Sequence, residues 1–398
     1  MKIVITGASG YIGSELIPLL KKANAQLLLA SRDEDKLRLL YPGCRVTSYE
    51  NLEVEMHNYD AIIHLAVMNN NIVDSICNFR AVNVTFLESV LNSARSAKVK
   101  TFINTTTLHT TSQRPLSSYA KTKLEAEAVL SKASGITIIN LRLPASYGET
   151  FSGKLALLSK LPNFLRPTAF QLLASFKATV NIKLIASAIL DTVHNKTSAE
   201  SIISDKQDGN LIYHATKRFF DLSFALFVTI FLWWILLGAW LAIKLTSPGP
   251  GIFAQKRVGK GGLLFTCYKF RTMNLGTKEA GTHEITADKV TAVGRFLRKT
   301  KIDELPQVWN IFKNELSLVG PRPCLPSQQE LISARHKHGV FDKIGGITGW
   351  AQIQNVDMSD PTRLAKLDAE YLALRTIPFD LKIIYATATG RGQGDKIK

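Results

Sequence analysis

The stretch TGASGYIG, residues 6–13, decides how the first part of this chain folds. It ends the short apolar run KIVITG and leads into a helix-like pattern, so Gly7, Gly10 and Gly13 lie between a strand and a helix. Glycine lets the backbone turn tightly and approach a pyrophosphate, which then lies at the amino end of the helix. Glycine-rich turns are common, however, so this spacing needs support from the rest of the chain.

Strand-like and helix-like runs alternate through residues 1–148. The runs QLLLAS, AIIHLA, TFINTTT and TIINLRL are short and rich in Val, Ile, Leu and Thr, and helical patterns such as VTFLESVLNSARSA lie between several of them. This alternation predicts a doubly wound parallel sheet with right-handed crossovers, a Rossmann-like α/β domain. We expect the domain to occupy residues 1–213, because the polar stretch SDKQDGN marks its end.

The segment SSYAKTKLEAE contains Tyr119 and Lys123, four residues apart. Residues at this spacing share one helix face, so we expect the lysine ammonium to lie near the tyrosine phenol and to lower its pKa. A tyrosine tuned in this way can move a proton to or from an alcohol oxygen during hydride transfer. Taken alone, the pair is more often an exposed helix pair.

Taken together, these patterns make residues 1–150 resemble the extended short-chain dehydrogenase/reductase family that acts on nucleotide sugars. The resemblance is carried by T-G-x-x-G-x-x-G, H-L-A, a threonine-rich strand, Y-x-x-x-K and LRLPASYG, in that order. It implies that Tyr119 is the catalytic acid/base and that Lys123 binds the ribose. It also implies that Thr107, or Thr106 by one register, is the hydrogen-bonding residue of the threonine-rich strand.

The second predicted strand ends in LLLASRD, which bears on the choice of cofactor. Arg32 suits the 2′-phosphate of NADP, whereas the neighbouring Asp33 suits the ribose hydroxyl of NAD. We expect NADP(H), with NAD as the alternative. His64 is predicted to be a packed residue at a strand end rather than a base. The expected cofactor-binding residues are Gly7, Gly10, Gly13, Arg32 and Asp60.

The substrate lobe of that family is usually longer than residues 149–213 provide. We therefore expect a pocket that is reduced, or one that is completed by the other half of the chain.

The run FALFVTIFLWWILLGAWLAI, Phe224 to Ile243, contains no charged residue. A helix of this length is about 30 Å long, which is enough to cross the hydrocarbon core of a bilayer. Basic residues flank both ends, Lys217 and Arg218 before it and Lys244 after it, so the charges indicate no inside/outside asymmetry.

The net charge of the chain is +17, and more of the excess follows the apolar run than precedes it. Such a balance favours an anionic membrane surface or phosphate-bearing substrates. Nucleic acid is not expected as a partner, because no helix-turn-helix, zinc-finger or RNP pattern is found. The four cysteines form no C-x-x-C pair, which indicates reduced thiols in a cytosolic setting. The amino terminus does not have the pattern of a signal peptide.

In the second half, KIDELPQVWN places Asp303 and Glu304 side by side after the basic run RFLRKTK. Adjacent acids at a helix start point in different directions, so one can attack while the other holds a divalent cation. Arg322 lies between two prolines in SLVGPRP, where a stiff backbone suits a forked grip on phosphate. Further basic residues with interleaved aromatics follow the SPGP turn. They are Arg257, Lys269 and Arg271.

Residues 217–384 resemble the bacterial monotopic phosphoglycosyl transferases, which move a sugar-1-phosphate from a nucleotide sugar onto polyprenyl phosphate. The matching motifs are SPGP, Q-x-R-x-G, YKFRTM, DELPQ-x-W-N, SLVGPRP, ITGWAQ and LDAEY. The resemblance implies that Asp303 is a nucleophile that forms a phosphosugar intermediate, and that Glu304 with Asp303 places Mg²⁺. The implied phosphate-binding residues are Arg298, Arg322, Arg257, Lys269 and Arg271.

Two features depart from that family. The loop IGGITGWAQIQNVD lacks a proline and an arginine that family members often carry there, which puts its nucleotide and sugar contacts in doubt. The membrane helix of the family also commonly breaks at a Ser-Pro pair, whereas the middle of this run reads FLWWILLG.

Both halves would draw on cytosolic nucleotides, so a single spanning helix would deprive one of them of substrate. We therefore expect residues 214–246 to form a re-entrant membrane helix that bends between Trp233 and Gly238. Residues 247–398 would be the mixed α/β transferase domain. Both domains would then lie on the cytoplasmic face of the bacterial inner membrane.

The whole chain is accordingly predicted to be bifunctional. The first half would reduce or epimerise a UDP-sugar, such as a 4-keto-6-deoxy UDP-N-acetylhexosamine, and the second would transfer the sugar phosphate to polyprenyl phosphate. The alternative keeps the transferase and makes the first half a non-catalytic nucleotide-binding module. A membrane-anchored reductase with an interaction platform would not explain DELPQ and GPRP. A homo-oligomer is compatible with either reading.

Overall fold

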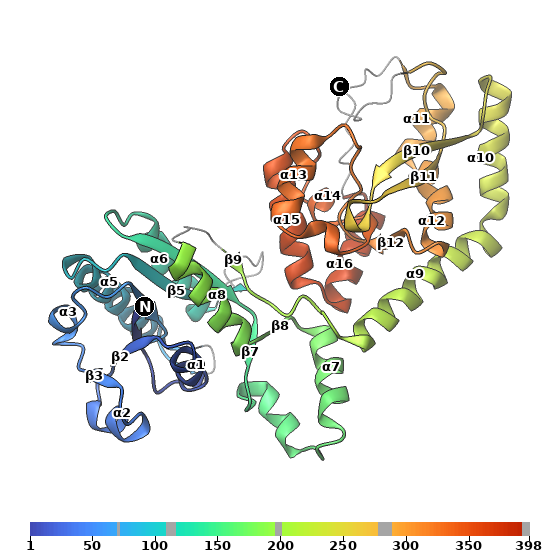
Figure 1. Ribbon diagram of the computed structural model, residues 1–398. Helices are drawn as coiled ribbons and strands as arrows, with labels where there is room; N and C mark the ends of the chain where they lie inside the picture. Colours follow the sequence, from blue (N-terminus) through green and yellow to red (C-terminus); the bar gives the residue numbers. More distant parts are fainter. Residues whose placement is uncertain (70–71, 109–116, 196–200, 278–288, 392–398) are drawn as a thin grey trace. The chain divides into compact units, whose positions relative to one another are not determined.

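The computed structural model describes residues 1–69, 72–108, 117–195, 201–277 and 289–391. Contacts divide the chain into two compact units (Figure 1). The first unit comprises Met1–Phe170 and Lys177–Asp205, and the second comprises Gln171–Phe176 and Lys206–Lys398. Each unit has hydrophobic clusters of its own, as a domain does.

The first unit is built on a seven-stranded sheet in the order β3-β2-β1-β4-β5-β6-β9, with all neighbouring strands parallel. This is the order of a doubly wound Rossmann-like sheet, which confirms the predicted fold class of the first half. The strands are β1 (Lys2–Thr6), β2 (Gln26–Ala30), β3 (Arg45–Thr47), β4 (Ala61–His64), β5 (Thr101–Thr107), β6 (Thr137–Leu143) and β9 (Ser201–Ile202).

The central strands read as continuous apolar runs because both faces of the sheet are covered. In β1, Ile3 and Ile5 pack into a cluster with Leu16 of the first helix, whereas Val4 packs into the cluster on the opposite face with Leu87. Burying one such side chain contributes about 1.5–3 kcal/mol. The helices of this unit are α1 (Tyr11–Lys22), α2 (Glu34–Leu40), α3 (Leu52–Glu55), α4 (Ile76–Arg80), α5 (Leu87–Ser96), α6 (Ser118–Ser131) and α8 (Ile182–Asn195).

Three shorter features complete the first unit. A π-helical segment, η1 (Ala81–Phe86), joins α4 to α5, and a 3₁₀ segment, η3 (Gly153–Lys160), follows the sheet. The strands β7 (Ala145–Tyr147) and β8 (Thr179–Asn181) form a separate parallel pair. The helix α7 (Arg166–Phe176) ends inside the second unit.

The second unit is mixed α and β. An antiparallel hairpin joins β10 (Ile252–Val258) to β11 (Leu264–Phe270), and a parallel pair joins β12 (Leu316–Val319) to β13 (Gly345–Thr348). Around them lie α9 (Leu211–Phe231), α10 (Trp233–Thr246), η4 (Lys260–Gly262), α11 (Ala292–Lys299), η7 (Ile302–Gln307), α12 (Val308–Phe312), α13 (Gln329–Lys337), η8 (Val340–Asp342), α14 (Trp350–Ile353), α15 (Pro361–Leu374) and α16 (Ile377–Ala388).

The uncharged run is divided between α9 and α10. Within the described residues, no single helix is long and apolar enough to cross a membrane, but these two pass that test together, with a bend of 66° at the break. The break is at Leu232, which has φ −110° and ψ 10°. The predicted bend between Trp233 and Gly238 was therefore placed too late in the chain.

Packing accounts for the position of this break. On α9, Ala225 and Val228 are buried in a cluster with Ile311 of α12 and Leu316 of β12. On α10, Ala239 and Ile243 are buried in a different cluster, with Phe270 of β11 and Leu297 of α11. The fully buried residues of the two helices thus lie in different clusters, and Leu236 of α10 packs against both.

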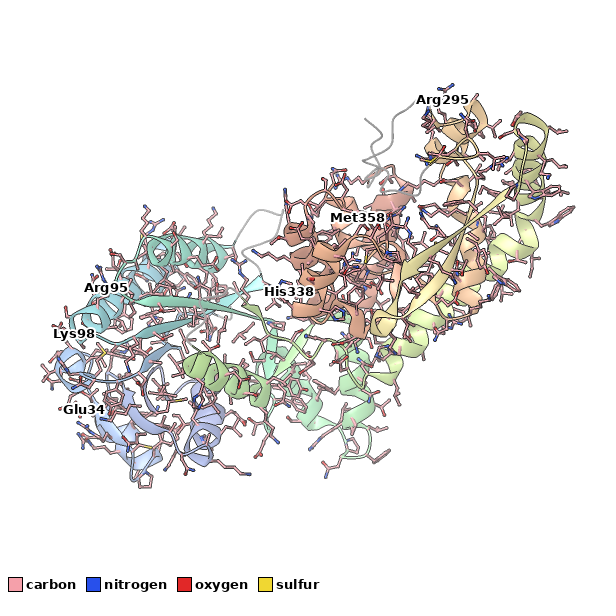
Figure 2. The ribbon with its side chains drawn as sticks, turned by 45° about the horizontal axis from the view of Figure 1, so that its top comes forward. Glu34, Arg95, Lys98, Arg295, His338 and Met358 are labelled. Atoms are coloured by element: carbon pink, nitrogen blue, oxygen red, sulfur yellow. The ribbon has the colours of Figure 1, made fainter. Side chains whose placement is uncertain are left out.

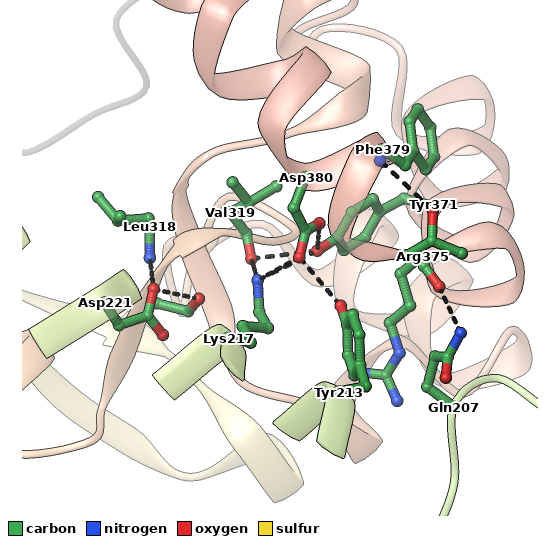
Figure 3. Close-up of polar contacts among 12 residues, drawn as sticks. Gln207, Tyr213, Lys217, Asp221, Leu318, Val319, Tyr371, Arg375, Phe379 and Asp380 are labelled. Carbon is green, nitrogen blue, oxygen red and sulfur yellow. Dashed lines mark hydrogen bonds and ion pairs between the residues drawn. The ribbon is translucent and has the colours of Figure 1, made fainter. Parts of the chain in front are cut away.

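A buried polar network fixes the beginning of α9 to the rest of the second unit (Figure 3). Lys217 Nζ donates to Asp380 Oδ2 at 3.0 Å and to the Val319 carbonyl at 2.9 Å. The hydroxyls of Tyr213 and Tyr371 donate to the two oxygens of Asp380, at 3.0 and 2.7 Å. Burial, and then the negative charge of Asp380, raises the pKa of both tyrosines, so they remain donors at neutral pH.

The outer faces of several helices carry charged side chains, as Figure 2 shows for Arg95 at the end of α5 and Arg295 on α11. On α11, Phe296 is also 59% exposed, beside the exposed Arg295. A basic and an apolar side chain thus lie next to each other on the helix that packs against α10.

Candidate active sites

In the first unit, the glycine-rich turn lies between β1 and α1 and leaves no room for side chains at two of its positions. A Cβ on Gly7, whose φ is +71°, would lie 2.6 Å from the backbone nitrogen of Ala66. A Cβ on Gly13 would lie 2.7 Å from the Ala8 carbonyl oxygen. Gly10 is the N-cap of α1 and offers no side-chain acceptor. The first amides of this helix are therefore suited to a pyrophosphate.

Arg32 and Asp33, the two residues expected to distinguish NADP from NAD, follow β2 closely. Arg32 is exposed, and its positive charge reaches the phenol of Tyr49, whose oxygen is hydrogen-bonded to the Gly7 amide. Asp33 caps α2 by accepting from the Lys36 amide at 3.0 Å. Burial raises the pKa of Tyr49. Sequence reasoning missed Tyr49, because it follows the short strand β3 and belongs to none of the recognised motifs.

The structure does not bring Asp60 to this turn. Asp60 immediately precedes β4, and in a parallel sheet the beginning of that strand lies at the edge opposite the glycine-rich turn. Its carboxylate accepts from the Lys2 amide at 3.0 Å and from Lys100 Nζ at 2.9 Å. These bonds hold the pKa of Asp60 below its usual range. The expectation that Asp60 binds cofactor is therefore corrected: it closes the amino edge of the sheet.

Tyr119 lies on α6 and is hydrogen-bonded to Thr107 at the end of β5. Thr106 instead donates to Glu127 Oε1 at 2.6 Å, so Thr107 and not Thr106 is the partner of Tyr119. Burial raises the pKa of Tyr119 to about 12. The expected lowering by Lys123 is not found in this geometry.

Lys123 is buried beneath the site, only 1% exposed. Its ammonium donates to the Thr105 carbonyl at 2.8 Å, and burial lowers its pKa to about 8. His64 is fully buried, with Nδ1 3.0 Å from Thr6 Oγ1. Burial and then the charge of Lys123 lower the pKa of His64 to about 3, so it is a neutral packed residue, as expected.

Asn83 is a further polar residue that the sequence did not reveal. It is fully buried in the π-helical segment η1, and its side chain accepts from the Met68 amide at 2.8 Å and donates to Thr122 Oγ1 at 3.2 Å. It thus ties the segment after β4 to the helix that carries Tyr119. Segments of π-helix are frequent at functional sites.

In the second unit, Asp303 and Glu304 lie on η7, after Lys301 has turned the chain in a left-handed conformation with φ 57°. Glu304 Oε1 accepts from Lys269 Nζ at 2.9 Å and from Arg322 at 2.8 Å. Burial alone would raise the pKa of Glu304, but the charges of Arg322 and Lys269 outweigh it and hold the pKa well below its usual range.

The pKa of the neighbouring Asp303 is shifted in the opposite direction. Burial, and then the negative charge of Glu304, raises the pKa of Asp303 to about 6, against the lowering effects of Lys269, Arg298 and Arg322. Arg298 is oriented by a bond from its Nε to Thr272 Oγ1 at 2.8 Å. One carboxylate is thus firmly paired, and the other is buried with less direct compensation.

The remaining two predicted phosphate-binding residues are hydrogen-bonded to groups other than the carboxyl pair. Arg271 is buried and bonded to the carbonyls of Ser247 and Pro248, in the turn after α10. Arg257 donates to Gln255 and to the Pro323 carbonyl, so it supports the loop that carries Arg322.

Within the described residues, no group of three or more His, Cys, Asp or Glu side chains could hold a metal ion. Asp303 and Glu304 offer two adjacent carboxylates. Mg²⁺ is commonly bound by one or two carboxylates together with substrate phosphates and water. The donor set therefore fits a magnesium ion shared with a diphosphate.

Two family models match the chain. The model of the bacterial sugar transferases matches residues 212–392, and that of the NAD dependent epimerase/dehydratase family matches residues 3–169. Among solved structures, the chain is similar to the Bordetella bronchiseptica enzyme WbmH in complex with NAD+, with 20% identity and a TM-score of 0.41 over 52% of this chain and 75% of that one. UDP-N-acetylglucosamine 4-epimerase from Bacillus cereus gives 18% identity and a TM-score of 0.40, over 51% and 79%.

Curated relatives match the second half. Undecaprenyl-phosphate glucose phosphotransferase of Komagataeibacter xylinus is 39% identical over 43% of this chain but only 35% of its own length. A UDP-glucose:undecaprenyl-phosphate glucose-1-phosphate transferase of Caulobacter vibrioides is also 39% identical, over 67% of its length. The uncharacterized sugar transferase EpsL of Bacillus subtilis is 38% identical over 84% of its length. The relatives and the two family models confirm both resemblances: the protein belongs to the bacterial sugar transferase family, and its first half carries a domain of the NAD dependent epimerase/dehydratase family.

Proposed function

We propose that the second unit transfers a sugar-1-phosphate from a UDP-sugar to undecaprenyl phosphate. The observation that carries this proposal is the carboxyl pair of Asp303 and Glu304, around which Lys269, Arg298 and Arg322 converge. Three cations against two carboxylates leave an excess of positive charge for a diphosphate. The relatives named for transfer from UDP-glucose to undecaprenyl phosphate support the same substrate classes.

Asp303 is the nucleophile in this proposal. Its carboxylate attacks the phosphorus that carries the sugar, a bond from Asp303 to phosphorus forms, and the bond to the leaving uridine monophosphate breaks. A phosphate oxygen of undecaprenyl phosphate then attacks the same phosphorus, and Asp303 departs as a carboxylate. The pKa of about 6 keeps most of Asp303 ionised at neutral pH, and its weaker pairing leaves it freer to react than Glu304.

Glu304 and Asp303 would hold Mg²⁺, which when bound would screen the diphosphate and stabilise the leaving phosphate. Arg322 and Lys269 keep Glu304 ionised and fixed in place. Arg298, oriented by Thr272, would contact phosphate oxygens beside Asp303.

For the first unit, we propose an NAD(P)-dependent nucleotide-sugar reductase or epimerase in which Tyr119 moves the proton. The hydrogen bond between Tyr119 and Thr107 supports this activity. The preferred cofactor is NADP(H), because Arg32 is exposed beside the glycine-rich turn, while Asp33 is occupied as a helix cap.

A second candidate for the first unit is a non-catalytic nucleotide-binding module. The observation in its favour is Lys123, whose ammonium is bonded to the Thr105 carbonyl, together with the raised pKa of Tyr119. Under this candidate, nucleotides would bind at the glycine-rich turn without chemistry at Tyr119.

The bent pair of α9 and α10 is proposed to be a re-entrant anchor on an anionic membrane. Both units would then lie on the cytoplasmic face of the bacterial inner membrane, where UDP-sugars and NADP(H) are available. The apolar side chains exposed along these helices support contact with lipid. They include Phe227, Ile230, Phe231, Trp233, Trp234 and Leu237.

The transferase is tested with UDP-sugars labelled in the phosphate that carries the sugar. Without lipid acceptor, the wild-type protein should retain label after denaturation, and adding undecaprenyl phosphate should move that label to lipid. Asp303→Asn should retain none, whereas Asp342→Asn, a control at an exposed aspartate, should behave as wild type. Label still bound covalently to Asp303→Asn would overturn the assignment.

A further inference from the structure

The break at Leu232 leaves a backbone group that a continuous helix would satisfy. In a straight helix, the Phe231 carbonyl would accept from the Ile235 amide. Here that amide donates to the Leu232 carbonyl instead, at 3.0 Å. In the hydrocarbon core no water is present to replace the lost bond, so irregular backbone is tolerated there only when its polar groups find other partners.

Trp234 provides such a partner. Its indole Nε1 donates to the Phe231 carbonyl at 3.0 Å, while its ring remains 60% exposed. The adjacent Trp233 is similarly exposed, at 57%, and within the described part of the chain its indole makes no hydrogen bond. The two tryptophans thus differ in this bond and hardly in exposure.

A second side chain acts on the same helix one turn earlier. Thr229 Oγ1 donates to the Ala225 carbonyl at 2.8 Å. Bonds of this kind weaken the helical ladder slightly and often accompany bends. The run Phe224 to Ile243 contains no proline, so side-chain donors replace the usual cause of a sharp helix break.

We propose that the indole N–H of Trp234 supplies the hydrogen bond that makes the break at Leu232 tolerable inside the bilayer, and so keeps both units on one side of the membrane. This proposal rests on the proposed re-entrant anchor. Without the indole donor, the helix regains a partner for the Phe231 carbonyl by straightening. A straightened helix spans the bilayer and separates the two units.

Packing opposes straightening, because Ala239 and Ile243 would leave their cluster with Phe270 and Leu297. Loss of the indole donor should therefore shift the population of chains rather than convert every one of them. The expected change is one that a comparison between two closely matched variants can measure.

The experiment uses the full chain in bacterial membranes and two single-residue reporters. The native Cys77 is exposed in the first unit, and Lys366→Cys introduces a thiol at an exposed position of the second. A membrane-impermeant maleimide is applied to cytoplasm-out vesicles and to spheroplasts, and labelled peptides are identified by mass. In the parent chain, both reporters should react in the vesicles only.

Trp234→Phe keeps the aromatic ring and removes the donor. One of the two reporters should then lose labelling in the vesicles by at least about threefold and gain it in spheroplasts. The matched control Trp233→Phe should retain the parent pattern. Equal labelling of Trp234→Phe and Trp233→Phe would overturn the proposal.

Trp234→Pro covers the case in which Trp234→Phe fails to accumulate. Proline cannot continue the helix, so it enforces a break without the indole, and both reporters should stay on one side. If Trp234→Pro fails in the same way as Trp234→Phe, the indole acts by another route and the proposal is wrong. If the parent chain itself labels from opposite sides, the re-entrant anchor fails as well, which separates the two failures.

Discussion

The two units place the basic residues of their motifs in different surroundings. In the first unit, Lys123 is enclosed in the core, bonded to a backbone carbonyl, and has its pKa lowered to about 8. In the second unit, Lys269 and Arg322 meet Glu304, while Asp303 beside them has a raised pKa. A motif lysine can therefore be bonded either to a neutral backbone carbonyl or to a charged carboxylate, and the motif alone does not show which.

The difference shows what a spacing rule leaves open. Four residues along a helix put Tyr119 and Lys123 on one face, but the depth of that face determines whether the ammonium meets the phenol or a carbonyl. In the second unit, charges of opposite sign converge from β11, η7 and the loop after β12, so the field at Asp303 is set by several segments.

Removing the charge of Glu304 should have the largest effect. Glu304→Gln should reduce sugar-phosphate transfer about a hundredfold to a thousandfold, because a preorganised charged group is lost from the site. Wild-type transfer should fall as the pH drops through about 6, where Asp303 takes up a proton. In the variant this fall should move to lower pH, since the negative neighbour is gone. The pH profile of residual transfer is the measurement.

Glu330→Gln, at an exposed position on α13, is the control and should leave both rate and profile unchanged. An unaltered acidic limb in Glu304→Gln would show that Asp303 is not governed by its neighbour.

The next test concerns the first unit. Tyr119→Phe should slow reduction of a 4-keto nucleotide sugar by NADPH at least about a hundredfold, because the proton donor is lost. Transfer of a preformed UDP-sugar by the same preparation should be unaffected, which serves as an internal control. NADPH oxidation is followed by absorbance. Equal oxidation by Tyr119→Phe and wild type would favour the non-catalytic module.

The enclosed Lys123 should give a pH-dependent stability. Its folded pKa of about 8 lies below the ordinary value of 10.5, so the folded chain releases this proton first as the pH rises. Stability of the first unit should increase by about 3 kcal/mol between pH 8 and 10.5 on account of this group. Pulse proteolysis in urea, read on fragments of the first unit, measures it.

Lys123→Met should lose that increase, whereas Lys121→Met, exposed on the same helix, should keep it. If the stabilities of Lys121→Met and Lys123→Met changed alike with pH, the lowered pKa of Lys123, and with it the contrast between the two units, would be contradicted.

The smallest effect is expected at Asp60. Asp60→Asn should leave NADPH affinity unchanged and alter stability by no more than about 1 kcal/mol, because its ion pair with Lys100 lies near the surface. Gly7→Ala is the contrasting variant in the same measurement. It should abolish cofactor binding, because its Cβ would meet the backbone of Ala66. Titration of NADPH fluorescence compares the two. A large loss of affinity in Asp60→Asn would contradict its place at the amino edge of the sheet.

Local patterns predicted the parallel sheet of the first unit and its glycine-rich turn, because strand alternation and turn chemistry are written in short segments. They misplaced Asp60, although it precedes the strand-like run AIIHLA and a parallel sheet puts the beginning of that strand at the edge opposite the glycine-rich turn. They placed the helix bend too late in the chain. The helix breaks at Leu232, between residues of α9 that pack near Ile311 and residues of α10 that pack near Phe270, and the sequence does not reveal these partners.

The carboxyl pair could be found from sequence, but its environment could not. Nothing in the spacing of YKFRTM distinguishes Lys269, which meets Glu304, from Arg271, which holds the turn after α10. Lys269 lies in β11, whereas Arg271 follows the end of that strand, and the sequence does not show where the strand ends.

The seating of α9 has a practical consequence for preparing this enzyme. Its Lys217 completes the network around Asp380, and its Ala225 and Val228 form part of the core. Removing α9 and α10 to obtain a protein that needs no detergent would take Ala225 and Val228 out of the core of the second unit. It would also remove Lys217, the ion-pair partner of Asp380. Solubilisation should instead replace the outward-facing apolar side chains of α9 and α10 while leaving their inner faces intact.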